Sequence, residues 1–290
     1  MFSRPSHCPN PACLHHQTAP ADFFINRGSY RTKHDRQQVP RYQCKTCMKT
    51  FSSRRFSPTY RQHKPQVNET LGNLLSSGVT QRRAAIVMGL NKVTVARKFA
   101  WLAGRGRQAH RTALATGQLN TSYVQFDEME TIEHSKLKPL SIALAVRPQT
   151  GEIIGAKVAT MNCHGHMAAL SQKVYGWRPD TRPMACRDVM NAIKAVAKPR
   201  ITVTTDGKAA YADLIKGAMP HAVHKPYVSR VAVHGARDPL FRLNHTCAKL
   251  RSDVSHLAPR TWSASKCLRG MQDHLDLYIG YNNRYDLKER

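Results

Sequence analysis

The sequence contains few acidic residues and no long apolar run. Its 290 residues include 18 Asp and Glu against 45 Lys and Arg, a formal net charge of +27. This excess favours a polyanionic partner over an ordinary metabolic role, because each phosphate that a basic side chain neutralises releases condensed counterions. No apolar stretch approaches the roughly 20 residues of a membrane helix, and the opening segment MFSRPSHCPNPAC lacks the apolar core of a secretory signal. We therefore expect an intracellular protein.

Internal repeats and low-complexity tracts are also missing, and a hydrophobic content of 41% excludes a disordered chain. The length predicts about two domains. Residues 1–112 contain 20 Lys and Arg and three acids, whereas the remaining 178 residues contain 25 and 15. The composition changes at residues 104–118, GRGRQAHRTALATGQ, which we interpret as a linker. The charge pattern predicts an N-terminal half that binds and a C-terminal half with a different task.

Four cysteines form two close pairs near the N-terminus. The pairs occur in CPNPAC and CKTC and comprise Cys8, Cys13, Cys44 and Cys47. Two such pairs about thirty residues apart are typical of a tetrahedral four-thiolate zinc site. The segment RYQCKTCMKTFS resembles the second knuckle of the zinc-ribbon family. We predict a zinc ribbon over residues 1–60 with a structural Zn²⁺, because so short a segment buries little apolar surface. There are two alternatives. His15 or His16 could take the place of Cys13 as a ligand, or the four thiols could be free.

Residues 66–103 have a helical apolar periodicity that is interrupted twice. A leucine stripe at 71–75 indicates a first helix that ends at Ser77–Gly78. Thr80 is a candidate cap of a second helix, and Gly89 permits a tight turn before a third helix from Lys92 to about Leu102. The residues of the second helix that we expect to face inward are Ala84, Ala85, Val87 and Met88.

This arrangement resembles the helix-turn-helix family, in which the later helix enters the major groove. The resemblance implies a DNA-binding domain over residues 61–103. The side chains expected to contact bases or phosphates are Arg82, Arg83, Lys92, Thr94, Arg97 and Lys98. A plain helical hairpin with a solvated basic face is the alternative, and the neighbouring cysteine motif and the overall charge favour DNA binding.

The remaining part, residues 119–290, predicts a mixed-sheet α/β domain. The expected strands are 122–130, 138–146, 152–159, 200–207 and 222–228, with helical segments after the third, fourth and fifth. Asp127 lies in the first of these strands and Asp206 in the fourth. This order matches the ribonuclease H-like fold, in which two carboxylates on neighbouring central strands share divalent ions. Solvated caps at strand ends are the alternative for either acid alone.

Two other groups of residues are less specific. The segment MNCHGHM brings together Cys163, His164 and His166, but it has no partner pair, so a loop or helix start is favoured over a metal site. Tyr278 and Tyr281 are spaced as in a C-terminal helix that packs on the core, and a recombinase-type tyrosine nucleophile is the alternative.

Three segments resemble bacterial insertion-sequence transposases of the DDE class. They are FDEM at 126–129, TTDGKAAY at 204–211 and LRSDVSHLAPRTWSASK at 250–266. The resemblance is to the insertion-sequence-one type, which joins a zinc ribbon and a helix-turn-helix to a ribonuclease H-like domain, and it covers the chain from Cys8 to about Asn283. It implies Asp127 and Asp206 as catalytic ligands of Mg²⁺ or Mn²⁺.

The same resemblance implies what the protein acts on. The partners would be double-stranded DNA, both transposon ends and target DNA, and a homodimer or higher multimer would form in the synaptic complex. The expected location is the bacterial cytoplasm, in association with the nucleoid.

The third catalytic acid of the family is missing. In the family it lies on the last helix with a basic residue seven positions later; counting back from Arg251 gives Asn244, 38 residues after Asp206. An asparagine carbonyl can still bind Mg²⁺. Other carboxylates could supply the missing charge, namely Asp238, Glu128 or Glu130, although the two glutamates leave an extended strand on the face opposite Asp127.

Two functions therefore follow from the sequence. One is an active transposase with a modified third ligand, which is our main hypothesis. The other is a transposase-derived DNA-binding protein, a repressor or architectural factor, that has lost catalysis.

Overall fold

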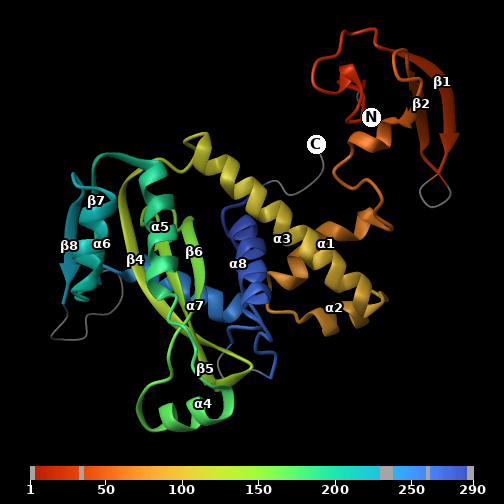
Figure 1. The fold of residues 1–290 in the computed structure, drawn as a ribbon. Helices are drawn as coiled ribbons and strands as arrows, with labels where there is room; N and C mark the ends of the chain where they lie inside the picture. The colour runs from red at the N-terminus through yellow and green to blue at the C-terminus, as the bar shows by residue number, and fades with distance from the viewer. Residues whose placement is uncertain (1–3, 33–35, 229–237, 259–261, 286–290) are drawn as a thin grey trace. The chain divides into compact units, whose positions relative to one another are not determined.

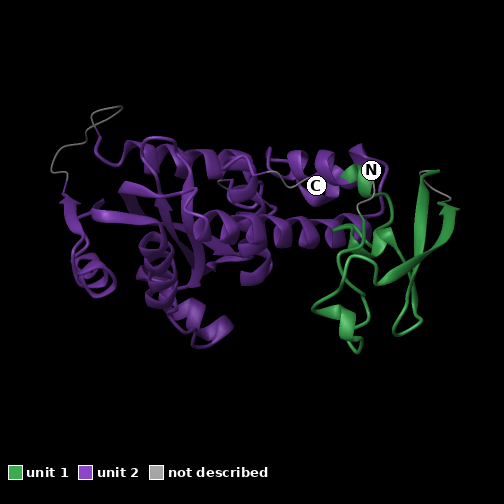
Figure 2. Cartoon of the chain, turned by 90° about the horizontal axis from the view of Figure 1, so that it is seen from above, with its two compact units in different colours: residues 1–67, 288–290 green, residues 68–287 purple. Residues whose placement is uncertain are grey.

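The structure is a computed structural model that describes residues 4–32, 36–228, 238–258 and 262–285. It divides into two compact units, residues 1–67 with 288–290 and residues 68–287 (Figure 2). The helices expected to form the helix-turn-helix thus share a unit with the α/β domain. In the described ranges, no helix has the length and apolarity needed to cross a membrane.

The first unit contains a three-stranded antiparallel sheet in the order β1-β2-β3 (Figure 1). Its strands are β1 (Phe24–Arg31), β2 (Gln38–Cys44) and β3 (Thr50–Ser52), with short 3₁₀ helices η1 (Leu14–His16), η2 (Ser53–Phe56) and η3 (Pro65–Val67). Its small core is aromatic: the ring of Phe24 lies 5.0 Å from that of Phe23 and 4.8 Å from that of Tyr42, both edge to face.

Three helices open the second unit: α1 (Asn68–Leu75), α2 (Gln81–Val87) and α3 (Lys92–Ala115). The expected cap of α2 is confirmed, because Thr80 Oγ1 accepts a hydrogen bond from the backbone N–H of Arg83 at 3.2 Å. Ala84 and Ala85 are buried as expected, but Val87 is 64% exposed, so the prediction that it faces inward was wrong. Val87 is the last residue of α2, and Ala84 and Ala85 are the residues of this helix that are buried.

Helix α3 continues to Ala115, so the predicted end near Leu102 and the predicted linker at 104–118 were both wrong. The Gly, Arg, Ala and Thr content of this segment suggested a linker, but tertiary packing overrides this weak propensity. The guanidinium of Arg107 donates to Asp273 at 2.6 Å and to Asp276 at 2.7 Å, both on α8 (Leu268–Asn282). Gly106 lets the helices approach closely, since a Cβ there would lie 2.3 Å from the carbonyl oxygen of Asp276.

A mixed five-stranded sheet forms the centre of the second unit, in the order β6-β5-β4-β7-β8 (Figure 1). The strands are β4 (Thr121–Glu133), β5 (Ser135–Val146), β6 (Ile153–Thr160), β7 (Ala197–Asp206) and β8 (Val223–Tyr227). Pairing is antiparallel within β4, β5 and β6 and parallel from β4 through β7 to β8. All five expected strands are present; β4, β5 and β7 are longer than expected, and β8 is shorter.

Helices cover both faces of this sheet. On one face, α5 (Arg182–Val196) and α6 (Ala210–Ala218) share a core with Val124, Phe126 and Val203. On the other face, α7 (Phe241–Asp253) and α8 pack on Met129 and on alternate residues of β5. A short helix, α4 (Ala168–Tyr175), follows β6. The expected packing of the C-terminal helix is confirmed for Tyr278, which is buried and donates to Asp253 Oδ2 at 2.9 Å.

A group of stacked rings lies where α3 meets α8. The ring of His274 is 4.3 Å from that of Phe99 and 4.0 Å from that of His256. Among the described residues, His274 Nε2 is buried without a hydrogen-bond partner. Burial lowers the pKa of His274 to about 3 and that of His256 to about 4. Both rings are therefore neutral in the fold at any pH near 7.

We expect Gly106→Ala to destabilise the second unit by about 1–3 kcal/mol, because the new methyl group overlaps the backbone of α8. The matched control is Gly104→Ala, two residues earlier on α3, where a Cβ meets nothing within 4 Å. There alanine should stabilise the helix by up to about 1 kcal/mol. Urea unfolding of the two variants measures the difference, and equal stabilities would contradict the close approach of α3 to α8.

We also expect the free energy of unfolding to fall as the pH is lowered from about 6.5 to about 4. In this window the unfolded chain protonates His256 and His274, whose ordinary pKa is 6.5, whereas the folded protein keeps them neutral. Each histidine contributes a slope of on the order of 1 kcal/mol per pH unit. His274→Phe keeps a ring but removes one titration, so urea unfolding from pH 7 to 5 should show a shallower dependence. An unchanged slope would contradict the burial of His274.

Candidate functional site

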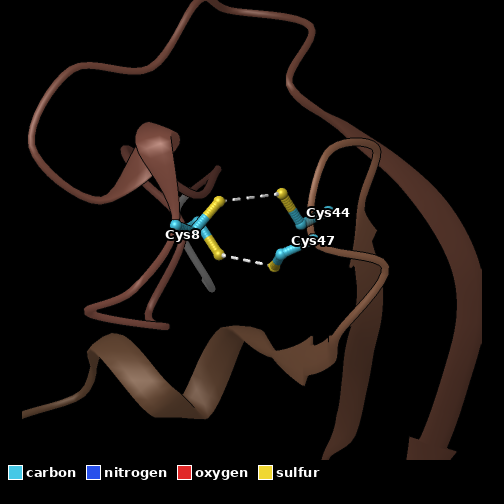
Figure 3. Close-up of side chains that lie close together, drawn as sticks. Cys8, Cys44 and Cys47 are labelled. Carbon is cyan, nitrogen blue, oxygen red and sulfur yellow. Dashed lines mark hydrogen bonds between the residues drawn. The ribbon is translucent and has the colours of Figure 1, made fainter.

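The four N-terminal cysteines converge in space. Their sulfur atoms all lie within 4.8 Å of one another (Figure 3). Cys8 Sγ is 3.6 Å from Cys47 Sγ, and Cys13 Sγ is 3.7 Å from Cys44 Sγ. Four thiolates around one zinc ion at about 2.3 Å lie about 3.8 Å apart. The donor set and its spacing therefore fit a metal such as zinc.

The neighbouring histidines take other roles. The carbonyl oxygen of Cys8 accepts a hydrogen bond from His16 Nδ1 at 2.8 Å, and the Cys8 N–H donates to the carbonyl oxygen of His15 at 2.7 Å. They shape the first loop, whereas Cys13 itself joins the cluster. The second pair lies on a tight turn in which the N–H of Met48 donates to the carbonyl oxygen of Cys44 at 3.0 Å.

The two strand acids lie side by side in the second unit. Strands β4 and β7 run parallel, with Gln125 opposite Thr204 and Phe126 opposite Thr205. The next residue on each strand is an aspartate, Asp127 and Asp206. Phe126 belongs to the core beneath α5 and α6, so both aspartates point to the other face, which α7 covers. The register thus places two carboxylates on one face of neighbouring strands.

The surroundings of Asp127 disfavour the ionised form of its carboxyl group. Burial raises the pKa of the Asp127 carboxyl to about 6, and the negative charge of Asp206 adds to this rise. The backbone N–H of Glu128, at 2.7 Å from Oδ1, acts in the opposite direction. A divalent cation would offset the repulsion between two adjacent carboxylates, and Mg²⁺ prefers such oxygen ligands. Asp127 and Asp206 therefore fit Mg²⁺ or Mn²⁺ chemically.

A buried tyrosine links Asp127 to Glu128. The hydroxyl of Tyr211 donates to Glu128 Oε2 at 2.9 Å and lies 3.3 Å from Asp127 Oδ1. Tyr211 is 2% exposed, and Lys208 forms an ion pair with Glu128. Burial acts to raise the pKa of Glu128, but the hydrogen bonds from Lys208 and Tyr211 lower it overall. Sequence reasoning missed both partners, although they stand two and five residues after Asp206.

Glu128 is thus already engaged by Lys208 and Tyr211, and the shared Tyr211 hydroxyl keeps its carboxylate near that of Asp127. Ser141 Oγ also donates to its Oε1 at 3.0 Å, and its side chain borders a cavity of about 490 Å³ lined by residues of α5 and α6. Glu130 is exposed. This placement agrees with the expectation that both glutamates leave β4 on the face opposite Asp127.

Gln125 attaches the start of α7 to β4. Its Nε2 donates to the carbonyl oxygen of Pro239 at 2.6 Å, and its Oε1 accepts from the backbone N–H of Leu243 at 2.8 Å. Gln125 precedes Asp127 by two residues, so both side chains lie on the same face. The first turn of α7, which includes Asn244, is therefore held beside the strand that presents Asp127.

One face of α7 carries the remaining candidate residues. Asn244, Cys247 and Arg251 follow one another at helical spacings of three and four. Burial raises the pKa of Cys247 to about 11; the charge of Arg251 lowers it and that of Asp127 raises it further. Asn244 itself is exposed, and its Nδ2 donates to Asp238 Oδ2 at 2.8 Å.

The helix-turn-helix candidates divide into two groups. Most are exposed or half-buried: Arg82, Arg83, Lys92, Thr94 and Arg97. Lys98 is 5% exposed, and its ammonium donates to Asn68 Oδ1 at 2.7 Å. The prediction that Lys98 points toward DNA was therefore wrong, because it lies on the same stripe of α3 as Val95 and Leu102, which are buried.

The segment around Cys163 forms a loop followed by the 3₁₀ helix η4 (Gly165–Met167), and both of its histidines are exposed. This agrees with the loop or helix start that the sequence favoured.

Comparisons with known proteins give little further information. No protein-family model matches the chain, and no curated protein matches it. One solved structure that it matches is the crystal structure of the Mos1 strand transfer complex, with 10% sequence identity and a TM-score of 0.30. The alignment covers 75% of this chain and 73% of that one. A match of such low identity and TM-score says nothing about function, which depends on the residues of this chain.

We expect Cys13→Ser to lower the zinc content from one ion per chain and to unfold the first unit, because few apolar residues besides the cysteine cluster hold it together. Metal analysis and proteolysis of residues 1–67 measure both effects. Cys163→Ser, which removes a thiol outside the cluster, is the matched control. Equal zinc content in the two variants would contradict the four-cysteine site.

Proposed function

We propose that the protein is a DNA transposase of the DDE class that cuts and joins DNA strands with two divalent ions, Mg²⁺ or Mn²⁺. The observation that carries this proposal is the register of β4 and β7, which brings Asp127 and Asp206 to one face of neighbouring strands. Phosphodiester chemistry explains why such a pair would occur in a chain of net charge +27: the basic residues hold DNA, and the scarce acids hold metal.

The arrangement of the sheet supports a ribonuclease H-like assignment for this part of the chain. Counted along the chain, the strands of the mixed sheet follow the order 3-2-1-4-5, with the first three antiparallel and the fourth parallel to the first. The acids lie on strands 1 and 4, the adjacent central pair. Helices follow strands 3, 4 and 5, as the sequence led us to expect.

In the proposed reaction, water attacks the phosphate at a transposon end, and the freed 3′-hydroxyl then attacks target DNA. The metal ions, when bound, would activate the attacking oxygen and stabilise the leaving one. Asp127 and Asp206 would hold these ions, and Tyr211 would fix the Asp127 carboxylate by its hydroxyl. Asn244 would contribute its carbonyl oxygen, and Arg251 would contact a DNA phosphate.

The N-terminal modules would bind the inverted-repeat ends. The exposed cations of α2 and the start of α3 supply phosphate and base contacts, namely Arg82, Arg83, Lys92 and Arg97. A structural Zn²⁺ would hold the ribbon that precedes them. Synapsis of two ends requires a dimer or higher multimer, and the protein would work on the nucleoid in the bacterial cytoplasm.

One observation favours a second candidate function. Asn244 is neutral where the resembling family has an acid, so the site has one negative charge fewer than an active member. A repressor or architectural factor that retains the DNA-binding modules would tolerate this loss.

Incubation of the full chain with its own element ends and Mn²⁺ tests the main proposal. We expect the parent to nick the ends and Asp127→Ala to be slower by at least about a hundredfold, since the loss of a metal ligand removes several kcal/mol of transition-state stabilisation. Arg97→Ala is the control for binding: it should weaken end binding but leave nicking intact at saturating DNA.

Equal nicking by the parent and Asp127→Ala would refute the catalytic assignment. Specific end binding without nicking by the parent, together with cleavage gained in Asn244→Glu, would establish the second candidate instead.

A further inference from the structure

We propose that Asp238 is a positioning residue for Asn244. Asp238 holds the side-chain amide of Asn244 so that the amide oxygen is available to a divalent cation. It also returns part of the missing negative charge to the site. This inference rests on the proposed function and deepens it, because it says how an asparagine serves as the third ligand.

The chemistry of the contact fixes the orientation of the amide. The distance between Asn244 Nδ2 and Asp238 Oδ2 is 2.8 Å. A carboxylate only accepts hydrogen bonds, so the group of Asn244 that faces it is the NH₂ group. Asp238 therefore binds the NH₂ group of Asn244 and not the amide oxygen. A divalent cation requires an oxygen and would be repelled by the NH₂ group.

Asp238 is itself held in place. Its Oδ1 accepts from the backbone N–H of Leu240 at 2.8 Å, and its carbonyl oxygen accepts from the N–H of Phe241 at 2.9 Å. Gln125 fixes the same helical turn onto β4 through Pro239 and Leu243. The Asp238–Asn244 pair is therefore attached to β4. Asp127 lies on the same strand, two residues after Gln125.

The hydrogen bond also changes the amide electronically. A charged acceptor makes a stronger bond than a neutral one and polarises the donor group. Polarisation of the N–H bonds of Asn244 shifts electron density toward its oxygen. The arrangement is an amide analogue of the carboxylate–histidine–metal unit, in which an outer carboxylate raises the basicity of the ligand.

Two other sources of the third charge fit the contacts less well. Glu128 is already bound by Lys208, Tyr211 and Ser141, which neutralise its charge and occupy its two oxygens. Direct ligation by Asp238 competes with the bonds that its two oxygens already make, to Leu240 and Asn244.

The substitution Asp238→Asn tests the proposal with little change in shape. Its remaining oxygen can keep the bond to the N–H of Leu240, so its NH₂ group then faces Asn244. The amide of Asn244 has to turn over to accept this bond, which presents its own NH₂ group to the cation. We expect Mn²⁺ affinity of the zinc-loaded full chain, measured by titration calorimetry, to fall by about tenfold or more.

Asp188→Asn is the matched control. It removes the same charge from an exposed ion pair with Lys157 and should leave Mn²⁺ affinity unchanged. Thermal unfolding of each variant verifies that the fold is retained.

The Asn244→Glu background separates positioning from direct ligation. A glutamate there supplies its own charge and is repelled by Asp238, so the second substitution Asp238→Asn should leave Mn²⁺ affinity unchanged or increase it. Loss of affinity in both backgrounds would overturn the proposal in favour of direct ligation by Asp238, and no loss in the parent background would also overturn it. Mn²⁺ binding that Asp127→Ala leaves intact would refute the proposed function itself, a result distinct from either of these.

Discussion

The parallel pairing of β4 with β7 determines where the negative charges of this basic molecule meet. Because the two strands are in register through Phe126 and Thr205, the aspartates that follow have to lie side by side. Burial makes this arrangement unfavourable without a cation and raises the pKa of Asp127 to about 6. Around the pair, Tyr211 contacts Asp127, and Gln125 attaches the first turn of α7 to the same strand.

The other acids of the second unit serve mainly to hold elements together. Asp273 and Asp276 bind Arg107 across the α3–α8 contact, and Asp253 accepts from the buried hydroxyl of Tyr278. With 45 Lys and Arg against 18 Asp and Glu, the chain carries a large excess of positive charge, which favours a polyanion. The few acids thus attach helices to one another, and the net charge of the chain stays strongly positive.

The strands, the clustered cysteines and the aspartate pair could be predicted from the sequence, because each depends on local pattern: β-branched runs, paired spacing and acids at strand ends. What could not be predicted depends on contacts between distant segments. Tyr211 on α6 reaches Asp127 on β4, and Gln125 contacts α7 across more than a hundred residues. For the same reason the composition of residues 104–118 suggested a linker, although Gly106 lies at a close crossing of α3 with α8. A count of basic residues likewise could not predict that Lys98 is buried against Asn68.

The unbroken course of α3 has a mechanical consequence. At 1.5 Å per residue, its 24 residues form a rod about 36 Å long. Its first turns carry the cations proposed to contact DNA, and Arg107, further along, is bound to α8, which packs on the sheet that carries the aspartates. A flexible joint would let a bound DNA end sample many directions. In the proposed transposase a rod would instead fix the angle and distance between the bound DNA end and the acids, so the length of one helix would set where a strand is cut.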